Sequence, residues 1–102
     1  MIKNYNILKY IEMVITDLIR DKESINVSDI HIFLQKGKPV VFDSSAIHLQ
    51  FHFPEMEIKN ILCRDRKHHK FIQGFDLEQV LKRMAEYPCL VDDECISFME
   101  VV

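Results

Sequence analysis

The sequence predicts an α+β fold, in which an antiparallel sheet of four to five strands packs against an N-terminal helix and two further helices. Three features predict this class: an amphipathic N-terminal segment, alternating apolar and polar residues near the middle, and turn residues between the alternating runs. Consecutive strands joined by short turns pair antiparallel, and helices then cover one face of the sheet. At 102 residues, the chain is expected to form one domain, residues 1–102.

The N-terminal helix is predicted over residues 5–22, where apolar residues recur at helical spacing. Asn4 or Asn6 is placed to cap its first turn, because an Asn side chain accepts a hydrogen bond from a free backbone N–H. Residues 21–26 are expected to form a polar connection. The residues on the apolar face of the helix are Ile7, Leu8, Ile11, Val14, Ile15, Leu18 and Ile19.

Three strands are expected next. Alternation over residues 30–34 predicts the first strand, and the turn at residues 36–39 contains Gly and Pro and leads into a strand at residues 40–42. A second turn is expected at residues 43–45. Apolar residues at every second position of 47–53 then predict a third strand with one wet face.

Two helices and two strands are predicted in the second half. Pro54 favours a short helix over residues 55–65, followed by a polar connection that ends at Lys70. Asp76 is a good N-cap for a helix that begins at Leu77. On that helix, Glu78 and Lys82 are spaced to form an ion pair.

The C-terminal segment is expected to form two short strands, residues 89–91 and 95–102, around the acidic turn Asp92-Asp93-Glu94. Cys89 and Cys95 could approach each other across this hairpin, but the pattern needs no disulfide. Three cysteines without a CxxC pair are typical of a protein that resides in the reducing cytoplasm.

Composition excludes several classes of function. The apolar runs are far shorter than the roughly 20 residues of a membrane-spanning helix, so membrane insertion is not expected. The formal net charge of −3 disfavours general nucleic-acid binding. Gly37 and Gly74 are the only glycines, so no glycine-rich phosphate loop can be written, and no cofactor is expected.

His31, His48 and His52 are all predicted on polar faces of strands. His48 and His52 would then lie about 13 Å apart and could not share one metal ion. We interpret the three histidines as sheet residues that are available to a partner. Asp29 and His31, two residues apart, could form an acid–base pair, but the sequence places no nucleophile to complete a catalytic triad.

Cys63, His68 and His69 could meet at the end of a helix. Zinc needs three or four ligands, and the chain offers no second spaced pair. Cys63 could also be a nucleophile with a histidine as base. A buried structural thiol is the favoured interpretation, so no metal site and no catalytic residue is predicted.

One basic cluster stands out in the chain, and it is interrupted only by Asp65. It is either a solvated connection or a patch that docks an acidic partner. Its members are Arg64, Arg66, Lys67, His68, His69 and Lys70.

The stretch Val27-Ser28-Asp29-Ile30-His31-Ile32, followed by a turn with Pro39 and a second strand, resembles the N-terminal, PAS-like domain of the motor ATPases of type II secretion systems and type IV pili. The N-terminal helix and the acidic strand near the C-terminus fit the same pattern. The family usually carries Arg-x-(Asp/Asn)-Gly in its second strand, whereas this chain has Val41-Phe42-Asp43-Ser44. The ATPase domain is absent from the sequence, so the resemblance transfers no catalytic residue.

The resulting hypothesis is a cytoplasmic, non-enzymatic protein-interaction module, an adaptor or regulator of a pilus or secretion assembly. Self-association is left open. The alternative is a small acidic inhibitor, an immunity protein or antitoxin, that presents the turn at residues 92–94 to a basic toxin or nuclease. The residues expected to contact a partner are Asp29, His31, His48, His52, Arg64, Arg66, Lys67 and Lys70.

Overall fold

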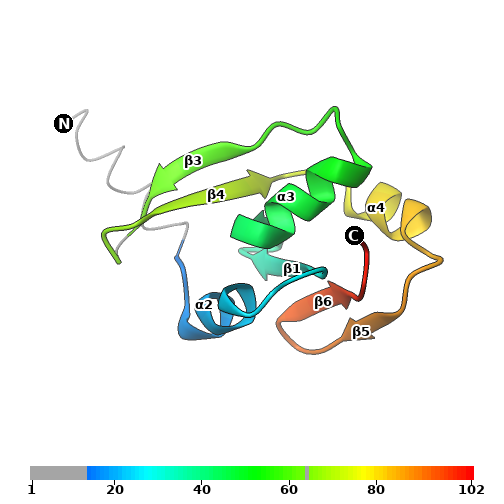
Figure 1. Ribbon diagram of the computed structural model, residues 1–102, viewed down its shortest axis with the longest axis horizontal. Helices are drawn as coiled ribbons and strands as arrows, with labels where there is room; N and C mark the ends of the chain where they lie inside the picture. The colour runs from blue at the N-terminus through cyan, green and yellow to red at the C-terminus, as the bar shows by residue number, and fades with distance from the viewer. Residues whose placement is uncertain (1–13, 64) are drawn as a thin grey trace.

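The computed structural model describes residues 14–63 and 65–102, and Figure 1 shows their arrangement. These residues form a six-stranded sheet in the order β3-β4-β2-β1-β6-β5, with every neighbouring pair antiparallel. The predicted α+β class is confirmed, although four to five strands were expected. Along the chain the elements are α2 (Asp17–Ser24), β1 (Ile30–Gln35), β2 (Lys38–Phe42), α3 (Asp43–His52), β3 (Lys59–Leu62), β4 (His68–Gln73), α4 (Leu77–Arg83), β5 (Cys89–Val91) and β6 (Cys95–Phe98).

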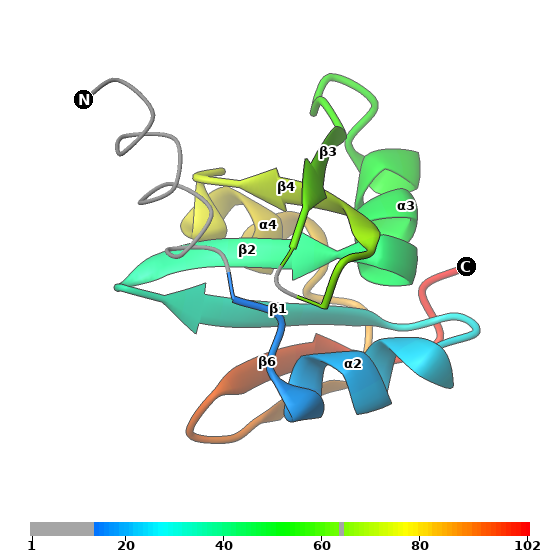
Figure 2. The same cartoon turned by 90° about the vertical axis from the view of Figure 1, so that its left-hand side faces the viewer.

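Both faces of the sheet bury apolar side chains. One face packs on α3 and α4, and its core includes Ile32, Leu49 and Val80. The other face packs on α2, where Ile19 lies in one cluster with Phe33. Figure 2 shows α2 in front of β1 and β6, with α4 behind β2. The sequence predicted helices on one face only, and the cover of the second face explains why four consecutive residues of β1 are buried.

The predicted helix over residues 5–22 is only partly testable, because residues 5–13, including the expected Asn6 cap, lie outside the described residues, as does Asn4. Within the described part, the helix begins at Asp17 and not earlier, since the Thr16 hydroxyl caps it by accepting a hydrogen bond from the Ile19 amide at 3.2 Å. The helix then continues to Ser24, so the polar connection expected from Asp21 is wrong over its first four residues.

The first hairpin is confirmed, although its predicted turn at residues 36–39 is too long, because Lys38 and Pro39 already belong to β2. In the register of β1 and β2, Gln35 lies opposite Lys38, which leaves a two-residue turn. Lys36 and Gly37 both have positive φ, 52° and 75°. Two successive positive φ values are the requirement of the tight turn whose twist matches a β-hairpin.

The turn predicted at residues 43–45 and the third strand predicted at residues 47–53 are both wrong, because helix α3 spans Asp43–His52. The period-two alternation is misleading: Ile47 and Phe51 are 50% and 72% exposed. The residues that pack inward are spaced for a helix instead. They are Ser45, Ala46 and Leu49 on the helix, with Phe53 directly after it.

The predicted helix over residues 55–65 is also wrong. Residues 59–62 form β3, which pairs with β4 along its full length. The polar connection expected up to Lys70 ends earlier, because β4 starts at His68. A strand pair therefore replaces a helix and a loop, and it extends the sheet beyond β2.

The C-terminal predictions are confirmed in most details. The Asp76 side chain caps α4 by accepting from the Gln79 amide, and Lys82 lies 3.5 Å from Glu78. β5 and β6 form the expected hairpin, although β6 ends at Phe98 and not at residue 102. Cys89 lies opposite Phe98 in the register and is free, as are Cys63 and Cys95.

Candidate functional site

The structure brings together three of the predicted residues near the start of β1: Asp29, His31 and His48. Only His31 belongs to β1 itself. The His48 ring donates from Nδ1 to the Asp29 carbonyl at 2.6 Å, and the Asp29 carboxylate accepts from the Glu100 amide at 2.9 Å. His48 and His52 are one turn apart on a helix, so the predicted separation of about 13 Å on a strand is wrong. The His52 ring donates from Nε2 to the Val101 carbonyl at 2.6 Å.

The sequence predicted that His31 is available to a partner, but the structure places this residue inside the sheet. The residue is 8% exposed, and its Nδ1 lies 2.7 Å from the Ser97 hydroxyl on the neighbouring strand β6. Burial lowers the pKa of His31, and the positive charge of Lys22 lowers it further. A neutral imidazole in a short hydrogen bond inside the sheet is a structural group.

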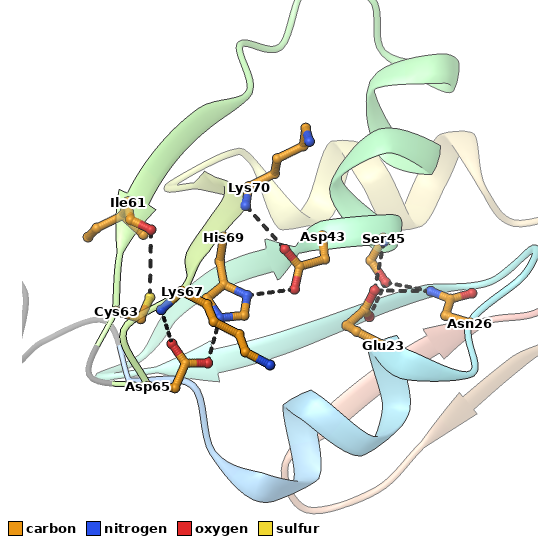
Figure 3. A network of polar contacts seen from close by, with 10 residues as sticks. All are labelled: Glu23, Asn26, Asp43, Ser45, Ile61, Cys63, Asp65, Lys67, His69 and Lys70. Atoms are coloured by element: carbon orange, nitrogen blue, oxygen red, sulfur yellow. Dashed lines mark hydrogen bonds and ion pairs between the residues drawn. The ribbon is translucent and has the colours of Figure 1, made fainter.

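A buried polar network caps helix α3 from a distant part of the chain. Phe42 precedes the helix and has no side chain able to cap it, so Glu23 of α2 accepts from the Ser45 amide at 2.9 Å. The Ser45 hydroxyl donates to the same carboxylate at 2.5 Å, and it accepts from the His31 amide at 2.8 Å. Asn26 also donates to Ser45 and Glu23. The network joins α2, β1 and α3, as Figure 3 shows for Glu23, Asn26 and Ser45.

The second polar network holds His69 of β4 between two carboxylates (Figure 3). Nδ1 lies 2.8 Å from Asp43 Oδ2, and Nε2 lies 2.7 Å from Asp65 Oδ2. Ionised carboxylates only accept hydrogen bonds, so both contacts are satisfied together when the two ring nitrogens carry protons and the ring is an imidazolium. Burial alone lowers the pKa of His69, but the hydrogen bonds to Asp43 and Asp65 outweigh it and raise that pKa. We call this arrangement the histidine clamp.

The histidine clamp joins three parts of the structure. Asp43 is the first residue of α3, Asp65 lies in the turn between β3 and β4, and His69 belongs to β4. Asp43 also accepts from the Lys70 amide at 3.2 Å. The hydrogen bond with His69 lowers the pKa of Asp65, which keeps that carboxylate ionised. The β3–β4 hairpin is thereby fixed to the helix.

The turn between β3 and β4 is closed by its own backbone. The Cys63 amide donates to the Lys67 carbonyl at 3.0 Å, and the Arg66 amide donates to the Cys63 carbonyl at 3.0 Å. The Lys67 amide donates to Asp65 at 3.0 Å. Within the described residues, the basic segment therefore forms a hydrogen-bonded turn followed by the start of β4, and its role as a docking patch remains a proposal.

Alternation along β4 turns His69 inward and its basic neighbours outward. His69 is 8% exposed, whereas His68 and Lys70 are both exposed. Lys59 on β3 and Arg66 and Lys67 in the turn are exposed as well, while Arg64 lies outside the described residues. We call the outward set the basic edge: Lys59, Arg66, Lys67, His68 and Lys70.

The geometry of Cys63 disfavours nucleophilic chemistry. Burial and the nearby carboxylates of Asp65 and Asp43 raise the pKa of the Cys63 thiol to about 11. A thiol with such a pKa is almost fully protonated at neutral pH, and the thiolate is the reactive form. Within residues 14–63 and 65–102, no group of three or more His, Cys, Asp or Glu side chains is arranged to hold a metal ion.

Sequence reasoning missed the roles of Glu23, Asp43 and Asp65. His69 was considered as a zinc ligand with Cys63 and His68, as a base for Cys63 and as a member of the basic cluster, but not as the partner of two carboxylates, and β4 turns His68 away from it. Asp65 four residues before His69 was a usable signal once that segment was recognised as a tight turn and a strand. Glu23 and Asp43 left no signal, because their partners lie 22 and 26 residues away.

Comparisons with protein families, with curated proteins and with solved structures returned no match for this chain. Among the described residues, no helix is both long and apolar enough to cross a membrane. The described residues define the class, an α+β domain built on a six-stranded antiparallel sheet.

Proposed function

We propose that this chain is a protein-interaction module that docks an acidic partner on the basic edge, and that it acts as an adaptor or regulator without a catalytic step. The observation that carries the proposal is the histidine clamp, which fixes the hairpin bearing these cations. A surface ordered on folding does not have to be ordered again on binding, which favours affinity. Cations held at fixed positions can also select a partner of complementary charge.

The basic edge combines charge with an open strand. β3 pairs with β4 on one side only among the described residues, so its other side offers backbone donors and acceptors. An extended acidic segment could add to this side as a further strand, with backbone bonds for affinity and charges for specificity. The resemblance of Ser28-Asp29-Ile30-His31-Ile32 to motor ATPase domains would make that partner a component of a pilus or secretion assembly, in the cytoplasm.

The test is capture of partners from a host lysate by three immobilised proteins: the wild type, K59E/K67E, and the control K38E/K82E. Both variants change the net charge by the same amount, but Lys38 and Lys82 lie on β2 and α4, away from the basic edge. We expect the control to retain the partner and K59E/K67E to lose it. Equal capture by all three proteins would contradict the proposal.

A small acidic inhibitor is the second candidate, and the exposed acidic turn between β5 and β6 favours it. The Asp92 carboxylate accepts from the Glu94 and Cys95 amides at 2.9 and 2.8 Å, so the turn presents Asp93 and Glu94 in a fixed geometry. A toxin or nuclease bound there would be lost from D93K/E94K and kept by K59E/K67E. Adding D93K/E94K as a fourth immobilised protein to the capture experiment therefore separates the two candidates.

A further inference from the structure

The two ends of the sheet carry opposite charges. β3 forms one end and β5 the other, and Figure 1 shows them on opposite sides of the molecule. The basic edge surrounds β3. The chain directly after β5 is Asp92-Asp93-Glu94, and all three residues are exposed. We call β5 with this turn the acidic edge.

The acidic edge also exposes apolar side chains. Leu90 and Val91 are 65% and 72% exposed, and within the described residues β5 pairs only with β6. Natural proteins commonly protect an edge strand with lysine, proline or an inward charge. β5 has no such residue among Cys89, Leu90 and Val91. Leu62 at the end of β3 is 48% exposed, so each end offers an apolar contact beside its charges.

We propose that the occupant of the basic edge is the acidic edge of a second copy of this chain, so that sheets join end to end. This inference rests on the proposed docking role of the basic edge and names its partner. The contact joins two different surfaces, so each added copy leaves one free edge of each kind. Such an assembly grows with concentration and does not stop at a dimer. Charge complementarity and the matching open strands carry the argument.

The interaction is expected to be weak and sensitive to salt. β3 and β5 contain only four and three residues, so few backbone hydrogen bonds form between copies. We expect a dissociation constant of about 0.1–1 mM at low ionic strength. Exposed charges are screened over about 8–10 Å near physiological salt, so added salt should weaken the association.

The experiment is analytical ultracentrifugation of the purified full chain over a concentration series, at low and at high salt. The basic edge is altered in K59E/K67E, with K38E/K82E as its control. The acidic edge is altered in D93K/E94K, which keeps the Asp92 hydrogen bonds, with E57K/E86K as its control. The wild type should show an average mass that rises with concentration, as should both controls. Either edge variant alone should associate at least about tenfold more weakly.

The decisive measurement uses variants in which the two edges again carry opposite charges. The fourfold variant K59E/K67E/D93K/E94K exchanges the charges of the two edges and leaves the net charge unchanged. It should regain association, and so should an equimolar mixture of the two edge variants. A single-chain mass for the wild type at about 1 mM and low salt would overturn the inference. So would a fourfold variant and a mixture that both remain monomeric while the wild type associates.

These outcomes separate the inference from the proposed function. If the purified chain is monomeric but K59E/K67E still loses a protein captured from the lysate, the basic edge docks a different acidic partner. If the chain self-associates as described and no other protein depends on the basic edge, its partner is another copy of the chain. If neither result is obtained, both proposals fail.

Discussion

His31 and His69 are buried to the same extent, with 8% of each residue exposed, yet their pKa values shift in opposite directions. His31 lies beside a neutral hydroxyl and near Lys22, so burial dominates and lowers its pKa. His69 lies between two carboxylates, which raise its pKa despite burial. The contrast shows that the partners of a buried histidine, and not its exposure, decide its charge.

The two residues also differ in what they hold together. His31 joins neighbouring strands β1 and β6, which already share a backbone ladder. His69 joins β4 to the β3–β4 turn through Asp65 and to the first residue of α3 through Asp43, in addition to the backbone ladder between β4 and β2. Loss of His69 should therefore loosen a larger unit than loss of His31.

The largest effect is expected for His69→Ala. The substitution leaves Asp43 and Asp65 without their shared cation in a partly buried site, and we expect a loss of about 2–3 kcal/mol of unfolding free energy. Urea denaturation followed by circular dichroism measures this value. Native-state hydrogen exchange should show β3 and β4 losing protection before β1 and β6. A loss below about 0.5 kcal/mol, the size of an ordinary surface change, would contradict the histidine clamp.

A smaller loss, about 1–2 kcal/mol, is expected for His31→Ala. It removes one hydrogen bond to Ser97 and some buried contact, but it strands no charge. The same urea experiment applies, and hydrogen exchange should change mainly along β1 and β6. If this variant proves less stable than His69→Ala, the ranking of the two sites is wrong.

The opposite shifts predict opposite dependences on pH. His69 has a raised pKa when folded, so its contribution to stability is complete below the unfolded value of 6.5 and is lost as pH rises through the folded pKa. His31 has a lowered pKa, so its contribution is present above 6.5 and is lost as pH falls through the folded pKa. Urea midpoints measured between pH 5 and 9 should drop less on the alkaline side in His69→Gln than in the wild type. An unchanged alkaline slope would count against an imidazolium at position 69.

The smallest effect belongs to His68→Ala, the matched control for His69→Ala on the adjacent position of β4. His68 is exposed, so we expect a change within about 0.5 kcal/mol. The urea midpoint of His68→Ala should therefore match that of the wild type. A large loss of stability in this variant would mean that the hairpin depends on more than the histidine clamp.

Local patterns predicted those elements whose signals lie within a few residues. The turn at Lys36-Gly37 and the Asp76 cap are examples, and both were found. The segment after Phe42 failed because apolar residues lie at both periods there: every second position suggests a strand, while Ala46, Leu49 and Phe53 follow a helix. Its helix start is capped by Glu23, which only the folded chain brings there.

The candidate site was predicted in part. The sequence identified the basic residues as a patch. The positions of these residues are fixed by Asp43 and Asp65, which no sequence pattern connects to His69. The sequence placed His31, His48 and His52 on an accessible surface. The structure instead engages their rings with Ser97, the Asp29 carbonyl and the Val101 carbonyl, respectively. Tertiary hydrogen bonds thus redistribute the roles of residues that look equivalent along the chain.

The charge of His69 is the central claim, since it holds the basic edge in place. Nuclear magnetic resonance of ¹⁵N-labelled histidine rings reads the protonation of both ring nitrogens directly over a pH series. We predict that His69 keeps two protonated nitrogens to a higher pH than an unperturbed histidine, whereas His31 becomes neutral at a lower pH in the same samples. A His69 ring that becomes neutral at the same pH as His31, or below it, would contradict the account.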